Sequence, residues 1–590
     1  MSQDKNLQKL ELTWVGKYDE QQPLEPRILI ENPEYSYGDV ETGVLPNGKP
    51  WKGNMLIHGD NLLALKALEQ DYAGCVKCIY IDPPYNTGSA FEYYDDNLQH
   101  SIWLELMHKR LYLLKSLLSE DGFICCHIDD SEGHYLKTLM DEVFGRNNYL
   151  TTFYIRVRYA DKTLKQDMDF HKEIEYIHVY RKNYGAKPNK NEIKETFEKF
   201  NNYFIEGNPS KTITLGSKRV DVFERGQWSV EVREGSKTGR KEIWASGTIL
   251  DGNSSGRFFR DYLTGRYNED GYGILYKVYG IGDDNFDYRY FTGPQKEGAT
   301  KGKYYQGVPI TQLEKTEVIK YAPINNFYDF AANFGNCRTE GGAEFRGGKK
   351  PEILLQLILS HFSNDGDLIL DSFLGSGTTT AVSHKMNRKF IGIEMGNHCY
   401  SLCYPRMKKI IDGKDQTGIS KAQNWKGGGG FRFYELAPSL LKEDKFGNLV
   451  INKEYNADML AAAMAKQEGF TYAPSDELYW KQGHSSENDY IYTTTQFMTV
   501  EGLAAIAEQM KEGESLLVCC TAFQRECRTA FPNITIKKIP QMLLGRCEFA
   551  HDDYSLNIVE LPTIEEEYDE DFNDETTVPE SDEPQQMELF

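Results

Sequence analysis

The sequence has no apolar run near the roughly 20 residues that a helix needs to cross a bilayer. Its polar first residues, MSQDKNLQKL, do not form a secretory signal. Even so, 40% of its 590 residues are hydrophobic and 13% are aromatic, which is ample for globular folding. A chain of this length exceeds one hydrophobic core and suggests about three domains. We therefore expect a soluble, cytoplasmic protein of several domains that makes no membrane contact.

The eleven cysteines lack the spacing of a metal framework. Cys75 and Cys78 form a single CxxC pair, and no second pair follows at zinc-ribbon spacing. Two adjacent pairs, at 125–126 and 519–520, lie inside apolar, strand-like runs. We expect buried, reduced thiols and no metal site, with a metal or redox site at the CxxC pair as the alternative.

Basic residues do not outnumber acidic residues in this sequence. The net charge of −22 argues at first against a nucleic-acid partner. The charge is unevenly placed, however: Ile564–Phe590 hold 12 acidic residues and no Lys or Arg, whereas Glu206–Arg266 hold 11 Lys and Arg against 8 Asp and Glu. Because a local basic surface matters more to DNA than the total does, the charge does not exclude a DNA substrate.

Strand and helix patterns alternate in two blocks of the chain. In the first block, apolar strand patterns at 55–58, 75–81 and 122–128 alternate with helical patterns at 61–69, 102–118 and 132–144. The rhythm resumes at Lys350 and continues to about Ile411, after an irregular insert rich in Gly, Tyr, Lys and Arg. Strands that alternate with helices predict a parallel α/β sheet, and we expect the two blocks to complete one sheet together.

The first chemical signal is IYIDPPYNTGS, Ile79–Ser89. An apolar strand delivers Asp82 to its carboxyl end, where ligands bind in open α/β sheets. Pro83 and Pro84 fix the backbone that follows and remove amide donors, and Tyr85 offers a flat aromatic face. The alternative is an ordinary strand that ends in a Pro-Pro turn.

These residue types suit the exocyclic amine of an adenine, which has two hydrogens to donate and a ring to stack. The Asp82 carboxylate and the Pro83 carbonyl supply two acceptors, and Tyr85 supplies the stacking surface. Accepting both hydrogens gives the nitrogen a lone pair that can attack a methyl group, without a covalent enzyme intermediate. The base must leave the duplex to reach such a pocket.

The second signal is DLILDSFLGSGTTTAVSHKMNRKFIGIEM, Asp367–Met395. It predicts a strand, a glycine turn, a helix and a second strand that ends in Glu394, 19 residues after Gly375 and placed to hold ribose hydroxyls. A Walker A loop is excluded because Gly377 is followed by Thr378, and the GxGxxG of nicotinamide sites is not met. The F-x-G-x-G form after the acidic Asp371 favours S-adenosylmethionine.

Taken together, the two signals resemble the β group of amino-methyltransferases that act on adenine in DNA, most of all the modification subunits of type III restriction–modification systems. That group carries the catalytic motif before the cofactor motif, with target recognition between them, and this chain has the same order. The resemblance covers roughly Trp51–Leu440. Its segments are Leu56–Leu68, Ile79–Asp96, His108–Glu132, Phe345–Ile358, Phe373–Thr379, Phe390–Met395 and Trp425–Leu436.

The resemblance implies a role for each matching residue. Asp82, Pro83, Pro84 and Tyr85 would form the catalytic pocket. The residues that would bind S-adenosylmethionine are Phe373, Gly375 and Gly377 with Asp371 at the glycine turn, Glu394 at the ribose, Lys350 and Pro351 by the methionine portion, and Asp60 near the adenine. For Asp60 a helix N-cap is the alternative.

The resemblance also implies a fold and a domain order. We expect an α/β, Rossmann-like, S-adenosylmethionine-dependent methyltransferase sheet with circularly permuted motif order, an inserted target-recognition domain and a small mixed C-terminal domain. The expected order is an N-terminal arm (1–50), a first methyltransferase segment with the catalytic motif (51–150), the insert (151–333), a second methyltransferase segment with the cofactor motif (334–440), the C-terminal domain (441–562) and a disordered acidic tail (563–590).

Two further regions are candidates for partner contacts. In the insert, the candidate contacts to double-stranded DNA are Lys237, Arg240, Lys241, Arg257 and Arg260, although a solvated basic face explains them as well. The chain ends in QQMELF, and Gln586, Leu589 and Phe590 resemble the short peptide by which bacterial replication and repair proteins bind the sliding clamp. An apolar chain end without a partner is the alternative.

The functional hypothesis is therefore a sequence-specific DNA adenine N6-methyltransferase, the modification subunit of a type III restriction–modification system. Such subunits work as dimers with a helicase–nuclease partner, and nothing in this chain resembles either of those activities. The alternatives are an orphan adenine methyltransferase and an inactive DNA-binding module. Methylation of RNA or of a protein glutamine is disfavoured because those relatives begin the motif with Asn, and cytosine because its enzymes begin with Ser.

Overall fold

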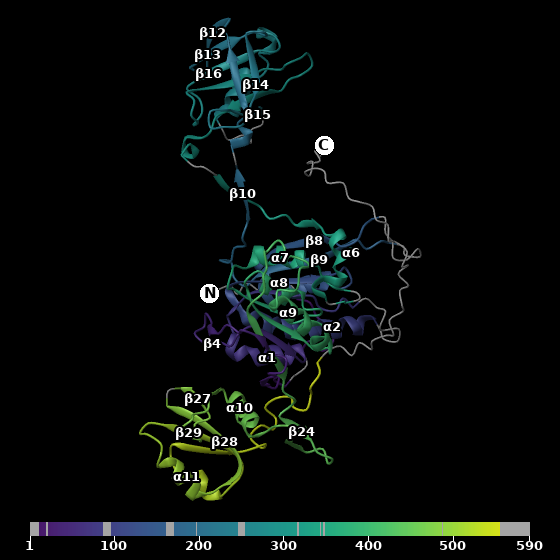
Figure 1. Cartoon of the computed structure of the whole chain (residues 1–590), viewed down its shortest axis with the longest axis vertical. Coiled ribbons are helices and arrows are strands. Elements are labelled where there is room, and N and C mark those ends of the chain that lie inside the picture. Colours follow the sequence, from purple (N-terminus) through teal and green to yellow (C-terminus); the bar gives the residue numbers. More distant parts are fainter. Residues whose placement is uncertain are drawn as a thin grey trace, which may run out of the picture. The chain divides into compact units, whose positions relative to one another are not determined.

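Strands from both α/β blocks lie in one eleven-stranded sheet in the computed structural model (Figure 1). The structure describes residues 11–18, 22–86, 96–160, 170–195, 197–245, 254–314, 318–342, 344–345, 348–486 and 488–554. Across the sheet the strands run in the order β1 (Leu29–Glu31), β23 (Gly430–Leu436), β5 (Met55–His58), β22 (Lys389–Glu394), β21 (Leu368–Asp371), β6 (Val76–Ile81), β7 (Leu118–Ile128), β9 (Ile174–Arg181), β8 (Tyr149–Arg156) and β20 (Phe327–Asp329), and β2 (Tyr37–Gly38) also pairs with β23.

The middle of this sheet is parallel and joins the two blocks. Strand β21 of the second block pairs in parallel with β6 of the first, and β22 pairs in parallel with β5. Toward the edge, β9 lies between β7 and β8 and runs antiparallel to both. The expectation that both blocks complete one Rossmann-like sheet is confirmed.

Helices cover both faces of the sheet because its strands bury side chains on both sides. Met55 and Ile57 pack in one core with residues of helices α1 (Asn61–Tyr72), α2 (Asp96–Leu117) and α3 (Gly133–Met140). Leu56, between them in the strand, packs in another core with α8 (Thr378–Lys385) and α9 (Tyr404–Ile411). Helix α7 (Glu352–Phe362) packs beside α8.

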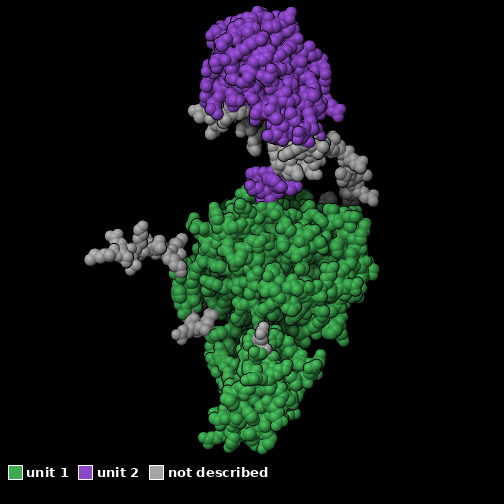
Figure 2. All heavy atoms as spheres, turned by 90° about the vertical axis from the view of Figure 1, so that its left-hand side faces the viewer, with its two compact units in different colours: residues 1–189, 325–590 green, residues 190–324 purple. Residues whose placement is uncertain are grey.

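The insert is a compact unit of its own, residues 190–324, called the inserted unit below (Figure 2). It has a six-stranded antiparallel sheet in the order β12 (Lys211–Leu215), β13 (Lys218–Phe223), β16 (Leu275–Tyr279), β17 (Tyr288–Thr292), β18 (Gly302–Gln306) and β15 (Lys241–Ala245). Its other elements are the pairs β10 (Asn191–Glu195) with β19 (Val318–Ala322) and β11 (Asn202–Glu206) with β14 (Trp228–Val232), and helices α4 (Ser254–Phe258) and α5 (Tyr267–Asp270).

The boundaries of this unit differ from the predicted insert, 151–333. Strands β8 and β9 pair with the central sheet, so the chain leaves that sheet only near residue 190. The prediction placed these strands in the insert because they follow each other without an intervening helix, and the α/β rhythm therefore ends at residue 150.

Residues 441–554 belong to the same compact unit as the central sheet and hold a smaller sheet, with the parallel strands β28 (Asp489–Met498), β29 (Ser515–Phe523) and β30 (Ile534–Lys538). Helix α10 (Ala457–Gln467) packs with Leu517 and Cys519 of β29, and α11 (Val500–Ala507) packs with Leu516 and Val518, so the two helices cover opposite faces. The remaining strands are β24 (Leu441–Glu443), β25 (Leu449–Ile451), β26 (Thr471–Tyr472) and β27 (Gly483–Ser486).

All eleven cysteines are free and buried, as expected for reduced thiols. Among the described residues, no group of three or more His, Cys, Asp or Glu side chains has an arrangement that could hold a metal ion. No helix within the described ranges is long and apolar enough to span a bilayer.

Candidate active site

The two sequence motifs meet at one edge of the sheet. Strands β6, β21 and β22 are neighbours and parallel, with Ile79 opposite Leu370 and Asp371 opposite Gly392. Their carboxyl ends therefore bring together Asp82, Asp371 and Glu394. Ligands of open α/β sheets bind at such an edge, beside the strand where the chain order changes. The motifs are almost 300 residues apart in the sequence, and only the strand order places them side by side.

Asp82 is held in a polar cluster just beyond β6. One carboxylate oxygen accepts a hydrogen bond from the Tyr85 hydroxyl at 2.9 Å, and the other pairs with the Lys350 ammonium at 2.9 Å. Lys350 also donates to the Tyr85 hydroxyl at 2.9 Å. Burial lowers the pKa of Lys350, but Asp82 and Glu175 outweigh this and raise it above its usual value. Lys350, predicted at the cofactor, therefore contacts the catalytic motif directly.

The backbone of the Pro-Pro turn is fixed from the side. The indole nitrogen of the fully buried Trp103 donates to the Pro84 carbonyl at 2.8 Å. Within the described chain, no hydrogen bond is made to the Pro83 carbonyl. Tyr85 packs against the main hydrophobic core, and burial, followed by the charges of Asp82 and Glu175, raises its pKa well above its usual value. The Pro84 carbonyl is thus held in place, and the Pro83 carbonyl has no hydrogen-bond partner among the described residues.

A second layer of polar groups lies behind this cluster and was not predicted from the sequence. Glu175, on β9, is 3.6 Å from the Lys350 ammonium and 3.1 Å from the Tyr85 hydroxyl. His127, fully buried on β7, places Nε2 2.8 Å from Glu175 and Nδ1 2.7 Å from the Tyr80 hydroxyl. Burial raises the pKa of Glu175, but Lys350 and His127 lower it well below its usual value. Glu175 is therefore an ionised second partner for Lys350.

For the methyl transfer to DNA that the sequence resemblance implies, we expect Glu175→Gln to lower kcat and to leave the KM for DNA nearly unchanged. The neutral amide no longer holds Lys350 and His127 in place, and misplacement of a reacting group by about 1 Å costs as much as ~100-fold in rate. Glu175→Asp, which keeps the charge, should restore some of the rate. Steady-state kinetics of the three proteins tests this, and equal kcat values would contradict it.

The glycine turn after β21 has the backbone shape that a closely bound ligand needs. Gly375 and Gly377 have positive φ angles of 57° and 79°. A Cβ on Gly375 would meet no atom within 4 Å, so this glycine faces open space. A Cβ on Gly392 of β22 would lie 2.7 Å from the Thr380 side chain, so glycine lets α8 approach the strand. The sequence motif therefore produces an open loop at a helix start.

Glu394, at the end of β22, makes hydrogen bonds to this loop. Its carboxylate accepts hydrogen bonds from the Gly375 amide at 2.7 Å and the Gly396 amide at 2.9 Å, and it lies 3.1 Å from His398. Phe373, predicted to bound the cofactor, packs partly buried against the main core. The acidic residue at the strand end thus shapes the glycine loop in this structure, and its role at a ribose remains a prediction.

Asp371 is engaged by its own turn. Its carboxylate accepts hydrogen bonds from the Phe373 amide and the Thr379 hydroxyl, and it is 2% exposed. Burial raises the pKa of Asp371 to about 7.

We expect the stabilising effect of Asp371→Asn to depend on pH. A carboxyl whose pKa is raised by folding favours the folded state at low pH, and this contribution is lost as pH rises from about 4 to about 7. The amide does not titrate, so the Tm of Asp371→Asn relative to wild type should increase over this range and level off above pH 7. Thermal unfolding from pH 5 to 8 measures this, with the exposed Asp365→Asn as control; a Tm difference independent of pH would contradict it.

The family model described as "DNA methylase", N6_N4_Mtase, matches residues 76–404, more than half of the chain. The chain belongs to this DNA methylase family. The match includes both motifs and Lys350, and it spans the inserted unit.

Curated relatives include three type III modification subunits. The chain is 34% identical over 425 residues to the probable HindVI Mod subunit of Haemophilus influenzae, covering 65% of this chain and 54% of that protein. It is 28% identical to the StyLTI Mod subunit of Salmonella typhimurium, covering 67% and 58%, and 29% identical to the EcoPI Mod subunit of Escherichia phage P1, covering 62% of each. The chain thus spans between 54% and 62% of the length of these relatives.

Solved structures of methylases also align with this chain, although weakly. The PvuII cytosine-N4-specific DNA methyltransferase covers 62% of this chain and 90% of its own, at 13% identity and a TM-score of 0.31. The M1.HpyAVI complex with its cofactor covers 60% and 98%, at 13% identity and a TM-score of 0.28.

Asp60 caps helix α1. One carboxylate oxygen accepts from the Leu62 and Leu63 amides at the start of α1, and the other accepts from the Tyr554 amide. Arg110 lies 3.5 Å away. The N-cap alternative is therefore seen in the structure, and both oxygens have partners, so a place near the cofactor's adenine stays a prediction.

The predicted DNA contacts of the inserted unit have different surroundings. Arg240 is 6% exposed, with its guanidinium 3.7 Å from the Phe286 ring centroid and bonded to the Tyr288 hydroxyl. A guanidinium buried among aromatic rings cannot reach a phosphate, so we withdraw Arg240 from the DNA contacts. Lys237 donates to the Leu313 carbonyl, Arg260 pairs with Asp261, and Lys241 and Arg257 lie on β15 and α4.

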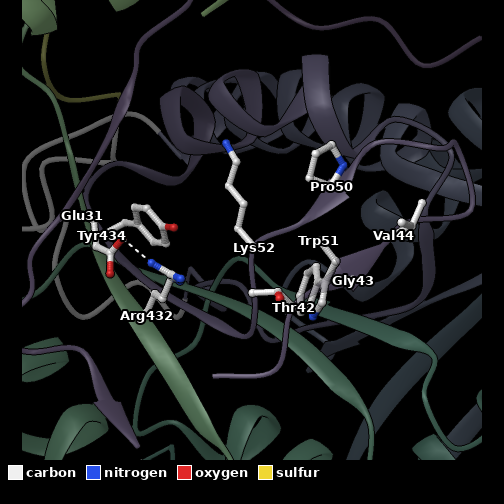
Figure 3. Close-up of a pocket in the computed structure, with 9 residues that line it drawn as sticks. All are labelled: Glu31, Thr42, Gly43, Val44, Pro50, Trp51, Lys52, Arg432 and Tyr434. Carbon is white, nitrogen blue, oxygen red and sulfur yellow. Dashed lines mark hydrogen bonds and ion pairs between the residues drawn. The ribbon is translucent and has the colours of Figure 1, made fainter. Parts of the chain in front are cut away.

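Figure 3 shows a hollow, about 480 Å³ in volume, whose lining includes no residue of the two motifs. It is formed by β1, β23 and the hairpin β3 (Gly43–Val44) and β4 (Pro50–Trp51). Arg432 at its wall is tied to Glu31 at 2.7 Å. None of the predicted site residues lines it.

Gln586, Leu589 and Phe590 of the tail lie outside the described residues.

Proposed function

We propose that this protein is a sequence-specific DNA methyltransferase that moves a methyl group from S-adenosylmethionine to the N6 amine of adenine. The observation that carries the proposal is the position of Asp82 and Tyr85 just after β6, directly beside the open glycine loop that follows β21. A target base at the first motif and a cofactor at the second would then be neighbours. Membership of the DNA methylase family supports the same conclusion.

The proposed role of Asp82, Pro83 and Tyr85 is to hold the flipped adenine. The Asp82 carboxylate and the Pro83 carbonyl would each accept one hydrogen of the amine, and the Tyr85 ring would stack on the base. The amine gains a methyl group and releases one hydrogen as a proton, and the Asp82 carboxylate is the group placed to receive it. Rigid acceptors of this kind lower a barrier because they need no reorganisation during the reaction.

Lys350 must leave the Asp82 carboxylate before the adenine amine can bind there. In the structure its ammonium occupies an oxygen of Asp82, 2.9 Å away, and Glu175 is a second partner at 3.6 Å. We propose that Lys350 pairs with the Asp82 carboxylate in the absence of a base and moves toward Glu175 when the base arrives. A buried ammonium that lost one carboxylate without gaining another would be strongly destabilised, so Glu175 makes this exchange possible.

The residues at the second motif fit S-adenosylmethionine. The open space beside Gly375 would accept a ligand close to the backbone, and Phe373 and Gly377 border the same turn. Glu394 would hold ribose hydroxyls, and Lys350 and Pro351 would lie by the methionine portion. When bound, the cofactor supplies a methyl group on a positively charged sulfur.

The wider assignment is to a type III restriction–modification system. The curated relatives carry that name, and the chain spans little more than half of their length. We propose that the protein acts on double-stranded DNA in the cytoplasm, as a homodimer with a helicase–nuclease partner. The alternative is an orphan methyltransferase that acts alone.

A direct test uses purified protein and S-adenosylmethionine with a radioactive methyl group. Duplex DNA, RNA and protein mixtures are offered separately, and labelled DNA is digested to nucleosides. We expect label in DNA alone, and in N6-methyldeoxyadenosine alone. Label in RNA, in protein or in cytosine would contradict the proposed substrate.

The tail proposal is separate. We propose that Gln586, Leu589 and Phe590 dock in a hydrophobic pocket of the bacterial sliding clamp. A peptide of these last residues should bind purified clamp in solution, and no binding at high micromolar concentration would refute the proposal.

A further inference from the structure

The inserted unit has a hollow of about 400 Å³ at one edge of its six-stranded sheet. Its walls are the edge strand β15, the start of β18 and the hairpin loop that joins β17 to β18. This volume lies in the range of small-ligand sites. None of the residues predicted to contact DNA lines the hollow.

An exposed indole forms one wall. Trp244 on β15 is 59% exposed, although its neighbour Ala245 is 1% exposed in the core of the unit. Lys303 lies opposite Trp244 in the register of β15 and β18, with its ammonium 4.4 Å from the centroid of the Trp244 ring. This cross-strand pair stabilises the sheet edge and accounts for Lys303. The pair does not explain why Trp244, the largest side chain of β15, borders the hollow.

Positive charge gathers at the same place. Lys303 is paired with Glu242, but Lys296 and Lys301 in the hairpin loop are exposed and have no ion-pair partner among the described residues. The inserted unit holds 21 Lys and Arg against 19 Asp and Glu, a net charge of +2, in a chain whose total is −22. The hollow thus lies in a compact unit that lacks the large negative charge of the whole chain and so repels a polyanion less.

A flat aromatic wall beside exposed lysines matches the chemistry of a nucleotide. Inside a stacked duplex a base offers only its edges to a protein. Its face becomes available to an aromatic side chain only when the base is unstacked. Lysines outside such a platform contact the phosphates on either side of the base.

We propose that this hollow takes one unstacked nucleobase of the target DNA, with Trp244 stacked on the base and Lys296 and Lys301 on the adjoining phosphates. The inference rests on the proposed function, because it assigns a recognition site for the same DNA substrate. In this proposal the solvent-exposed residues of the hollow contact DNA in place of the buried Arg240. It also predicts which residues of the inserted unit affect DNA affinity without any role in methyl transfer.

The first test measures DNA affinity of the full-length protein for a duplex with the sequence that the wild type methylates. Trp244→Ala should weaken binding on the order of 10-fold, as expected for the loss of one stacked base. The double variant Lys296→Gln/Lys301→Gln should lower the slope of log K against log salt by about 1.8. The matched controls are Phe446→Ala, an exposed ring beside Lys445 in the C-terminal domain, and Lys442→Gln/Lys445→Gln. Both controls should bind as the wild type does.

The second test identifies the base. Each nucleotide of the site is replaced in turn by an abasic residue, and binding is measured for the wild type and for Trp244→Ala. At one position of the site, removal of the base should weaken DNA binding by the wild type. The same removal should not weaken DNA binding by Trp244→Ala any further, because that variant has already lost the stacking contact. Unchanged binding by Trp244→Ala, or additive losses at every position, would overturn this proposal and leave the proposed function intact. A wild-type protein that neither binds nor methylates DNA would overturn both.

Discussion

Asp82→Ala is expected to slow methyl transfer by at least about 100-fold and to leave DNA binding intact. The substitution removes the carboxylate that would accept one hydrogen of the adenine amine, and it removes the nearest partner of Lys350. Loss of one preorganised hydrogen-bonding group in an active site costs about 100- to 1,000-fold in rate. Single-turnover methyl transfer measures the rate, and a gel-shift or anisotropy assay measures DNA affinity.

Asp82→Asn provides the sharper comparison. It keeps the shape of the side chain and one carbonyl acceptor, but it removes the charge and cannot take up the proton that the amine releases. We expect it to be nearly as inactive as Asp82→Ala. An asparagine variant with wild-type turnover would show that the carboxylate is not needed, and a wild-type protein without turnover would favour an inactive DNA-binding module.

Glu352→Ala is expected to destabilise the methyltransferase fold by about 3–5 kcal/mol, because it leaves buried positive charge without its partner. Glu352, at the start of α7, is completely buried and bonds to both Lys385 and Arg406, which are buried themselves. It also accepts from the Ile419 amide. This cluster thus joins α7, α8 and α9 behind the glycine loop. Chemical denaturation followed by tryptophan fluorescence measures the loss, with the exposed Glu443→Ala as control.

A double variant separates the loss of charge pairing from the loss of the side chain. In Glu352→Met/Arg406→Met one buried charge of each sign is removed, and Lys385 keeps Asp415 as its partner at 2.6 Å. The double variant should therefore be more stable than Glu352→Ala alone. A Glu352→Ala protein as stable as the wild type would contradict the role given to this buried cluster.

The motif residues could be predicted from the sequence because each stands in a local pattern. Asp82 follows an apolar strand and precedes two prolines, and Gly375 and Gly377 follow another. Such patterns fix a strand end and a turn whatever the rest of the chain does. The α/β rhythm around them predicts the sheet, although it does not predict that β21 lies between β22 and β6.

The second layer of the site could not be predicted in this way. His127 lies in the apolar run of β7 and has the pattern of a core residue. Glu175 lies in β9, a strand near the edge of the sheet that the prediction assigned to the insert. His127 contacts Glu175, which lies near Lys350, because β7 and β9 are neighbours in the sheet. In the same way, sequence alone could not show that Arg240 is buried, since a basic residue in a basic segment predicts an exposed surface.

The most direct test of the central claim is long-read sequencing of genomic DNA from a methylation-free host that expresses this chain, beside a host that expresses Asp82→Ala. We expect N6-methyladenine within one short asymmetric sequence motif in the first host and none in the second. A palindromic motif would keep the chemistry but point to an enzyme outside the type III group. Unmodified adenine in both hosts would contradict the account.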